Sequence, residues 1–258
     1  MKSSVLLIIA AASFVILGSA SGCNEVKQAV STDGKAGVAE EEIDQPTSMS
    51  NNENSRVRIS TSYGDMIVKL YDETPEHRDN FLKLVDEGFY NDLVFHRVIN
   101  NFMIQGGDPD SRGAAPNARL GMGGPGYTIP AEFNDRFIHK KGALAAARQG
   151  DQVNPQRRSS GSQFYIVHGT PVQEAMLLNM EARRNYGKDS TAQFHYTPEE
   201  ITAYATQGGT PHLDGEYTVF GEIVEGLNIV DSIAGVPVRS GDNRPLTDVL
   251  IKMERVKQ

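Results

Sequence analysis

The amino-acid sequence predicts a mainly β domain, either a barrel or a sandwich. Beyond residue 55 the chain contains many short runs of β-branched, aliphatic and aromatic residues bounded by turn residues, and few segments with helical periodicity. The chain has 258 residues, of which 39% are hydrophobic and 22% charged, and these are ordinary proportions for a globular protein. It is therefore long enough to bury a proper core.

The N-terminus predicts an exported lipoprotein. Lys2 is followed by an uncharged, mostly apolar run over residues 5–20, shorter than the ~20 residues that span a membrane comfortably. The run ends in the tetrapeptide ASGC, which resembles the lipobox of bacterial lipoproteins, with Ala where Leu is usual. We therefore expect a signal peptide at 1–22, lipidation of Cys23, and a location in the bacterial cell envelope, anchored on the periplasmic side of a membrane. Ordinary secretion and an uncleaved anchor are the alternatives.

The segment after the cysteine predicts a linker. Residues 24–54 are polar, carry seven acidic residues against two lysines, and have neither helical nor strand periodicity. This composition is typical of a solvated chain, so we expect a flexible acidic tether at 23–54 and one folded domain at 55–258. The net charge of −8 and the absence of a large Lys/Arg cluster in the sequence argue against a nucleic-acid partner.

The strands and helices of the folded part are predicted in order. Strands at 57–61 and 65–71 flank a hairpin turn in which Gly64 supplies the backbone freedom. A helix begins after Thr74 as N-cap, with Pro75 in its first position, and ends at Gly88. Further strands are expected at 94–99, 102–106, 143–147, 162–168, 217–223 and 248–256, with a short helix at 226–234.

One segment interrupts this series of short strands. Residues 172–206 are helix-prone, and Thr197 with Glu200 forms a Thr-x-x-Glu capping box that predicts a second helix start. We expect a two-helix insertion between adjacent strands. No internal repeat is visible.

Several motif matches in the sequence carry little weight. The stretch GMGGPG at 121–126 satisfies G-x-G-x-x-G, but it neither follows a strand nor opens a helix, so a glycine-rich loop is the better interpretation. Ser160 and Ser162 lack the G-x-S-x-G context of a nucleophile. The six histidines have no H-x-x-x-H spacing, zinc-type cysteine pairs are missing, and the acids are scattered. We expect neither a metal nor a cofactor.

The stretch FHRVINNFMIQGGD, residues 95–108, places polar groups in an apolar run. Burying an unpaired arginine would cost several kcal/mol, so the presence of Arg97 in this apolar run requires an explanation. Phe102 and Met103 can form an apolar wall, while Arg97 and Gln105 offer hydrogen-bond donors to the same space if both strands face one groove. An apolar cup beside an arginine suits a ligand that is apolar with one polar amide, and a proline residue fits that description.

This stretch resembles the characteristic motif of the cyclophilins, the peptidyl-prolyl cis/trans isomerases. Four more blocks resemble later blocks of that family in the same order, and with the first they cover residues ~55–258 apart from 172–206: GPGYTIPAEF, GALAAAR, SSGSQFYI and HLDGEYTVFGEI. The resemblance implies a closed eight-stranded antiparallel β-barrel capped by two helices. It also implies catalysis of rotation about X–Pro peptide bonds, with proline-containing peptides or unfolded exported proteins as substrates.

The resemblance also implies the site residues. Arg97 would be the catalytic arginine and Gln105 its support. Ala147 and Arg148 would bind the substrate backbone as an added strand, largely through main-chain groups. The other residues expected to bind substrate are His96, Phe102, Met103, Tyr165, His212, Leu213 and Tyr217. This chain departs from the eukaryotic pattern where His212 replaces a tryptophan, Tyr217 a histidine, Tyr165 a phenylalanine and Arg148 an asparagine.

Three hypotheses about function follow. The first is an exported, lipid-anchored, monomeric prolyl isomerase that assists the folding of envelope proteins. The second is a cyclophilin-fold binding module that holds proline-containing segments, or docks a partner through residues 172–206, with incidental isomerisation. The third, a carbohydrate- or lipid-binding barrel, has no supporting motif.

Overall fold

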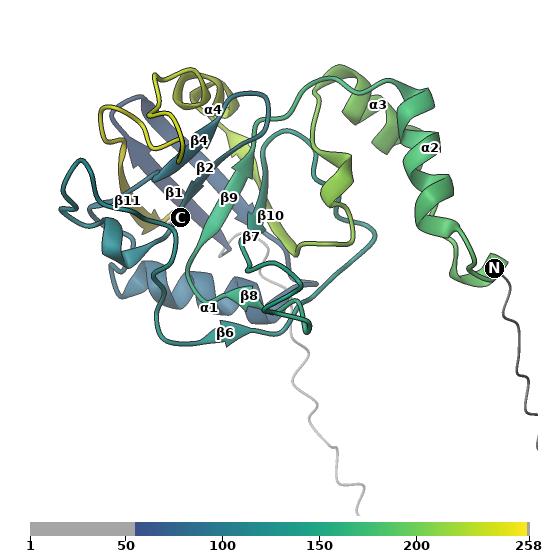
Figure 1. Ribbon diagram of the computed structural model, residues 1–258, viewed down its shortest axis with the longest axis horizontal. Coiled ribbons are helices and arrows are strands. Elements are labelled where there is room, and N and C mark those ends of the chain that lie inside the picture. Colours follow the sequence, from purple (N-terminus) through teal and green to yellow (C-terminus); the bar gives the residue numbers. More distant parts are fainter. Residues whose placement is uncertain (1–54, 257–258) are drawn as a thin grey trace, which may run out of the picture. The chain divides into compact units, whose positions relative to one another are not determined.

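A curled antiparallel sheet forms the body of the computed structural model, which describes residues 55–256 (Figure 1). The predicted signal peptide, lipidation site and tether lie outside the described residues. The strands of the sheet are β1 (Arg56–Thr61), β2 (Gly64–Leu70), β3 (Leu93–Val94), β4 (Arg97–Ile99), β5 (Met103–Gly106), β7 (Ala143–Ala146), β9 (Phe164–Val167), β10 (Val219–Glu225) and β11 (Leu250–Arg255). The short strands β6 (Thr128–Ile129) and β8 (Ser159–Ser160) pair separately.

The order of the strands brings the two edges of the sheet to neighbouring points of the chain. That order is β3-β11-β1-β2-β10-β7-β9-β5-β4, so β3 and β4 are the edges, and only Phe95 and His96 separate them in sequence. If β3 and β4 are counted as two halves of one strand, the sheet has eight strands instead of nine. The expected mainly β, cyclophilin-like architecture is thus confirmed, while the continuous strand predicted at 94–99 is interrupted by Phe95, which is fully buried in the core.

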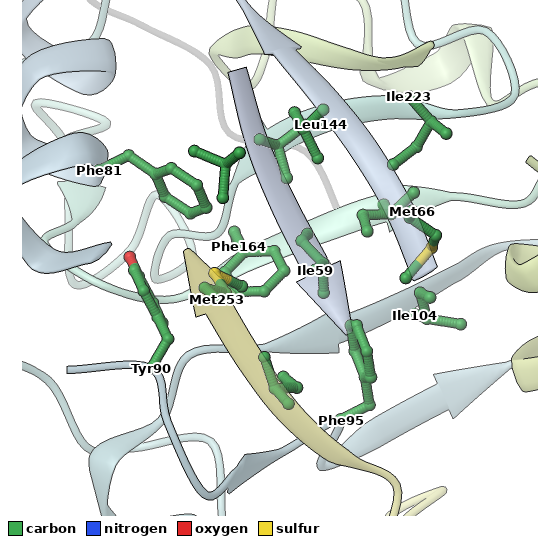
Figure 2. Packing of buried hydrophobic residues seen from close by; sticks show 14 of the residues in the cluster. Ile59, Met66, Phe81, Tyr90, Phe95, Ile104, Leu144, Phe164, Ile223 and Met253 are labelled. Atoms are coloured by element: carbon green, nitrogen blue, oxygen red, sulfur yellow. The ribbon is translucent and has the colours of Figure 1, made fainter. Parts of the chain in front are cut away.

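Side chains alternate between the inside and the outside of this sheet. In β9, Phe164 and Ile166 belong to the main core, whereas Tyr165 and Val167 belong to a second cluster on the other face. Figure 2 shows the main core, in which Phe164 lies among residues from several strands, including Ile59 and Leu144. The same strands therefore fill the core with one face and can build a surface site with the other.

Two helices cover the sheet, as predicted. Figure 1 places α1 (Pro75–Asp86) and α4 (Leu227–Ala234) at opposite ends of the barrel. The start of α1 differs from the expectation, because the side chain of Thr74 makes no cap hydrogen bond. Instead the carboxylate of Glu132 accepts hydrogen bonds from the backbone N–H groups of Glu76 and His77, at 3.1 and 3.0 Å.

The helical insertion is present and packs around a small core that is separate from the main core. It contains α2 (Glu174–Asn185) and α3 (Pro198–Thr206), which extend to one side of the barrel in Figure 1. The predicted capping box between Thr197 and Glu200 is formed. The residues of the small core are Ile138, Val172, Leu177, Phe194, Tyr196 and Tyr204. Among residues 55–256, no helix is long and apolar enough to cross a membrane.

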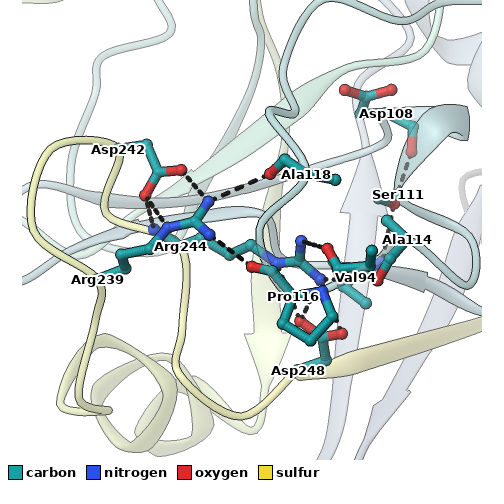
Figure 3. Close-up of polar contacts among 11 residues, drawn as sticks. Val94, Asp108, Ser111, Ala114, Pro116, Ala118, Arg239, Asp242, Arg244 and Asp248 are labelled. Atoms are coloured by element: carbon teal, nitrogen blue, oxygen red, sulfur yellow. Dashed lines mark hydrogen bonds and ion pairs between the residues drawn. The ribbon is translucent and has the colours of Figure 1, made fainter.

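Two arginines fix the loop that leads to the glycine-rich segment (Figure 3). Arg244 is buried, donates to the carbonyl of Ala115 at 2.8 Å and pairs with Asp248 at 2.9 Å. Arg239 donates to the carbonyls of Pro116 and Ala118. Charge-assisted hydrogen bonds therefore hold the chain just before residues 121–126. Residues 121–126 form neither a helix nor a strand, so the prediction of a glycine-rich loop is confirmed.

Replacing Glu132 with alanine tests the unexpected cap of α1. The variant Glu132→Ala should lower the free energy of unfolding by about 1–3 kcal/mol, because two N–H groups lose a charged acceptor. The measurement is urea unfolding at neutral pH. The matched control is Glu174→Ala, an exposed carboxylate in the first turn of α2, which should change stability by less than about 0.5 kcal/mol. Equal effects in the two variants would contradict the assignment.

Candidate active site

The register of four neighbouring strands brings the central predicted residues into one row. Arg97 of β4 is paired with Gln105 of β5, Gln105 with Tyr165 of β9, and Tyr165 with Ala145 of β7. Residues paired across a sheet project from the same face. The row lies on the outer face, because Ile104, which precedes Gln105 in β5, and Ile166, which follows Tyr165 in β9, belong to the inner core.

A pocket of about 150 Å³ opens over this row. It contains nine of the eleven residues for which a role in catalysis or substrate binding was predicted. Phe102, Met103 and Leu213 supply apolar surface, and Arg97 and Gln105 supply polar groups. The other lining residues are Ala147, Arg148, Tyr165 and Tyr217. A small cavity that combines an apolar wall with a few convergent polar groups is typical of a ligand site.

A chain of hydrogen bonds orients the arginine of the pocket. Arg97 donates to Oε1 of Gln105 at 3.2 Å, Gln105 donates to Oε1 of Gln163 at 3.0 Å, and Gln163 donates to the carbonyl of Gly123 at 2.7 Å. Burial lowers the pKa of Arg97 from its ordinary value, and Tyr217 opposes this shift. Arginine side chains keep their charge at neutral pH. Both Arg97 and Gln105 are thus held in defined orientations.

Gln163 is a site residue that the sequence analysis missed. It lies in the block SSGSQFYI, two residues before Tyr165, and this spacing in an extended strand places the two side chains on the same face. The two-residue spacing from Tyr165 was the feature of the sequence that could have identified Gln163. The sequence could not identify Gln105 as the hydrogen-bond partner of Gln163, because the two side chains come together only when β5 pairs with the segment before β9.

Arg148 contributes to the pocket wall and its guanidinium has partners within the protein. The guanidinium stacks over the ring of Tyr217 at 4.5 Å, and it pairs with Asp151 at 2.5 Å. Its Nε donates to the carbonyl of Glu216 at 2.9 Å. Its side chain is only 4% exposed. The ion pair with Asp151 and the contact with the ring of Tyr217 compensate its charge within the protein.

In the part of the chain that the structure describes, the backbone groups of Ala147 are hydrogen-bonded within the protein, whereas those of Arg148 are not. The N–H of Ala147 donates to the carbonyl of Gln163 at 3.0 Å, and its carbonyl accepts from the N–H of Ser160 at 2.8 Å. Within residues 55–256, no hydrogen bond to the main-chain N–H or carbonyl of Arg148 is found. A peptide that adds as an extra strand would therefore pair with the backbone of Arg148, while Ala147 contributes its side chain to the wall.

Two predicted residues lie outside the pocket lining. The ring of the exposed residue His212 stacks on Phe102, with 5.8 Å between ring centroids, and so contacts the pocket wall from outside the lining. His96 is buried between β3 and β4 and faces an adjacent cavity of about 260 Å³ with Leu120, Gly121 and Arg244. Arg97 and Gln105 line this adjacent cavity as well as the pocket, whereas His96 lines the cavity alone.

A larger cavity of about 600 Å³ adjoins the pocket and shares Gln105, Ala147 and Arg148 with it. Its far side is formed by the glycine-rich loop and by Asn154 and Arg158. Residues flanking a proline in the pocket would have space in this cavity. Within residues 55–256 there is no group of three or more His, Cys, Asp or Glu side chains that could hold a metal ion.

Fold and site together define a curled antiparallel β-sheet with a small pocket on its outer face. Comparison with protein families identifies the group: residues 56–256 match the family described as cyclophilin type peptidyl-prolyl cis-trans isomerase/CLD. The chain belongs to this family and is a peptidyl-prolyl cis-trans isomerase.

Curated relatives agree with this assignment. A protein of Staphylococcus saprophyticus with the provisional name peptidyl-prolyl cis-trans isomerase is 37% identical over 75% of this chain and 87% of its own length. A bifunctional phosphatase/peptidyl-prolyl cis-trans isomerase, also provisionally named, from Streptococcus pyogenes is 35% identical over 84% of this chain. The chain spans 42% of that relative's length.

Solved structures support the fold. A cyclophilin-type isomerase of Cryptosporidium parvum, crystallised in the presence of the dipeptide Ala-Pro, superimposes with a TM-score of 0.55 at 23% identity. The superposition covers 79% of this chain and 99% of the other. A second structure of the same protein gives a TM-score of 0.56 at 24% identity.

The buried His96 should make stability depend on pH. Burial lowers its pKa to about 4, with smaller contributions from Asp108, which opposes the shift, and from Arg97 and Arg244. The unfolded chain takes up this proton near pH 6.5, so the stabilising contribution is complete above that pH and is lost as the pH falls towards 4. The loss is about 3 kcal/mol.

The replacement His96→Leu should remove this contribution. The free energy of unfolding, measured by urea denaturation between pH 7.5 and 4, should then fall less steeply than in the wild type. The control is His195→Leu, because the side chain of His195 is 64% exposed. Parallel curves for the wild type and His96→Leu would contradict the prediction.

Proposed function

We propose that Arg97 is the catalytic residue for isomerisation and that the pocket around it holds the proline ring of the substrate. The observation that carries the proposal is the position of the half-buried guanidinium in a pocket with an apolar wall, oriented by the neutral amide of Gln105. Membership of the isomerase family supports it.

The X–Pro bond resists rotation because the nitrogen lone pair is delocalised into the carbonyl group, and the barrier is ~18–20 kcal/mol. In the twisted transition state that delocalisation is lost and the nitrogen becomes pyramidal. A hydrogen bond from Arg97 to this nitrogen is stronger in the transition state than in either planar ground state. This difference is the condition for catalysis.

The neighbours of Arg97 suit this role. Gln105 accepts one guanidinium N–H through an uncharged oxygen, so the arginine keeps its full positive charge. Partial burial strengthens its electrostatic interaction with a substrate atom, because water screens the charge less. The apolar wall of Phe102, Met103 and Leu213 fixes the ring while the rest of the peptide rotates. The mechanism requires neither a nucleophile nor a proton transfer.

Replacing the arginine tests the proposal. The variant Arg97→Ala of the full chain should lose about 10²–10³-fold in kcat/KM on a peptide with one X–Pro bond, because one transition-state donor is removed. The control is Arg183→Ala, an exposed arginine of α2. Both variants should keep the wild-type circular dichroism spectrum. Equal rates in Arg97→Ala and wild type would overturn the proposed role, and an inactive wild type would favour a binding module.

We propose further that the protein is exported and anchored by lipid at Cys23, acts as a monomer, and assists the folding of exported proteins on the periplasmic side of a membrane. Support comes from the signal-like run ending in ASGC, and from the lack of any other cysteine in the chain, which makes the remaining protein insensitive to an oxidising compartment. The acidic segment 24–54 would serve as the tether between anchor and enzyme.

Substitution of the cysteine tests the anchor. The variant Cys23→Ser should move the protein from the membrane fraction to the soluble fraction, because acyl chains supply the affinity for the bilayer. Mass spectrometry of the N-terminal peptide should detect lipid in the wild type and none in the variant. The control Ser31→Ala, in the tether, should stay with the membrane. Membrane association that is unchanged in Cys23→Ser would contradict the proposal.

A further inference from the structure

A buried aspartate lies between the helical insertion and the pocket. The side chain of Asp214 is 3% exposed and accepts four hydrogen bonds. Its Oδ1 accepts from the backbone N–H and the Nδ1–H of His139, at 2.8 and 2.9 Å. Its Oδ2 accepts from the hydroxyls of Tyr196 and Tyr204, at 2.8 and 2.6 Å. The four lone-pair directions of the carboxylate are thereby all used.

The histidine extends this network to the pocket wall. The contact between Nδ1 of His139 and Asp214 favours the tautomer with the proton on Nδ1, and in that tautomer Nε2 is an acceptor. The hydroxyl of Tyr165 lies 2.9 Å from Nε2 and donates to it. His139 is fully buried, and its ring is stacked against that of Tyr165. A phenylalanine in place of Tyr165 could not make this bond.

The two ends of the network belong to different parts of the protein. Tyr204 lies in α3 and Tyr196 just before it, so both belong to the insertion. Tyr165 lines the pocket, and Asp214 directly follows Leu213, which lines it too. None of the nine residues lining the pocket lies between 172 and 206. Any effect of the insertion on the pocket must therefore pass through intermediate residues.

The network has few ways to rearrange. Tyr204 is fully buried and Tyr196 and Tyr165 nearly so, which leaves little room for water to replace a lost partner. Burial and the neighbouring carboxylate of Asp214 raise the pKa of both insertion tyrosines far above 10, so their hydroxyls remain donors. Removing one hydroxyl leaves a buried carboxylate oxygen short of a partner and allows Asp214 and His139 to move.

We propose that the helical insertion sets the shape of the proline pocket through the chain Tyr196 and Tyr204 to Asp214 to His139 to Tyr165. The four residues before Tyr165 are positioning residues, and they determine how well the pocket binds the substrate ring. Arg97 is not part of the chain, so KM is affected more than kcat. The inference rests on the proposed function in one respect, namely that Tyr165 contacts the bound proline.

The test uses hydroxyl deletions in the full chain. Tyr196→Phe, Tyr204→Phe and Tyr165→Phe are made singly, and each insertion variant is combined with Tyr165→Phe. The matched control is Tyr186→Phe, the same chemical change on a residue of the insertion that is 92% exposed. The readouts are kcat and KM on a peptide with one X–Pro bond, and the thermal midpoint of each variant.

The expected result is a rise in KM of about three- to tenfold in Tyr196→Phe or Tyr204→Phe, with kcat changed less and Tyr186→Phe equal to wild type. In the Tyr165→Phe background the same substitutions should change KM no further, because the link to His139 is already cut. An unchanged KM in folded insertion variants, or an equal rise in both backgrounds, would overturn the inference. An inactive wild type would instead count against the proposed function.

A spectroscopic measurement covers the case in which Tyr204→Phe does not fold. Nitrogen-15 NMR of the wild type should find the proton of His139 on Nδ1 and a hydrogen-bonded Nε2. Tyr165→Phe should shift the Nε2 signal, and Tyr196→Phe should shift the signals of both ring nitrogens, while Tyr186→Phe leaves them unchanged. A His139 spectrum that is identical in wild type and Tyr196→Phe would refute the connection between insertion and pocket.

Discussion

The alternation of side chains along the curled sheet is the constraint on which both the core and the site depend. In β9 the residues Phe164 and Ile166 fill the barrel, and Tyr165 between them faces the pocket. The same holds in β5, where Ile104 points inward and Gln105 outward. A slip of one residue in either strand would place a glutamine or a tyrosine in the core and expose an aliphatic side chain. Core packing therefore also fixes the register of Arg97, Gln105 and Tyr165.

The charge in the pocket is kept available by the choice of its partner. A carboxylate beside Arg97 would compensate the guanidinium before any substrate arrived, whereas the amide of Gln105 orients it without neutralising it. Arg148, only 4% exposed, is in the opposite situation, because Asp151 already compensates its charge. Two arginines on one pocket thus serve different purposes, and the difference lies in their hydrogen-bond partners.

Patterns that depend on neighbours in sequence were predicted well. The hairpin of β1 and β2, the helices α1 and α4, and the capping box of α3 all follow from local chemistry. Features that depend on residues distant in sequence were missed. Glu132 replaces Thr74 as the cap of α1 from more than 50 positions away, and Gln163 reaches Gln105 only through strand pairing. The strand predicted at 94–99 is interrupted at Phe95, whose side chain packs in the core. Local sequence propensity does not predict this interruption.

The insertion illustrates why a buried polar network can serve a function that apolar packing serves less well. Packing of Ile138, Leu177 and Phe194 holds the two helices on the barrel, but a hydrophobic contact tolerates small rotations and slides. The hydrogen bonds at Asp214 have fixed directions and no spare acceptor positions, so they define one arrangement of the tyrosines relative to His139. Because His139 in turn directs the hydroxyl of Tyr165, a change of conformation in the helices has a defined route to the pocket wall. The same residues that dock the insertion thereby make pocket geometry dependent on it.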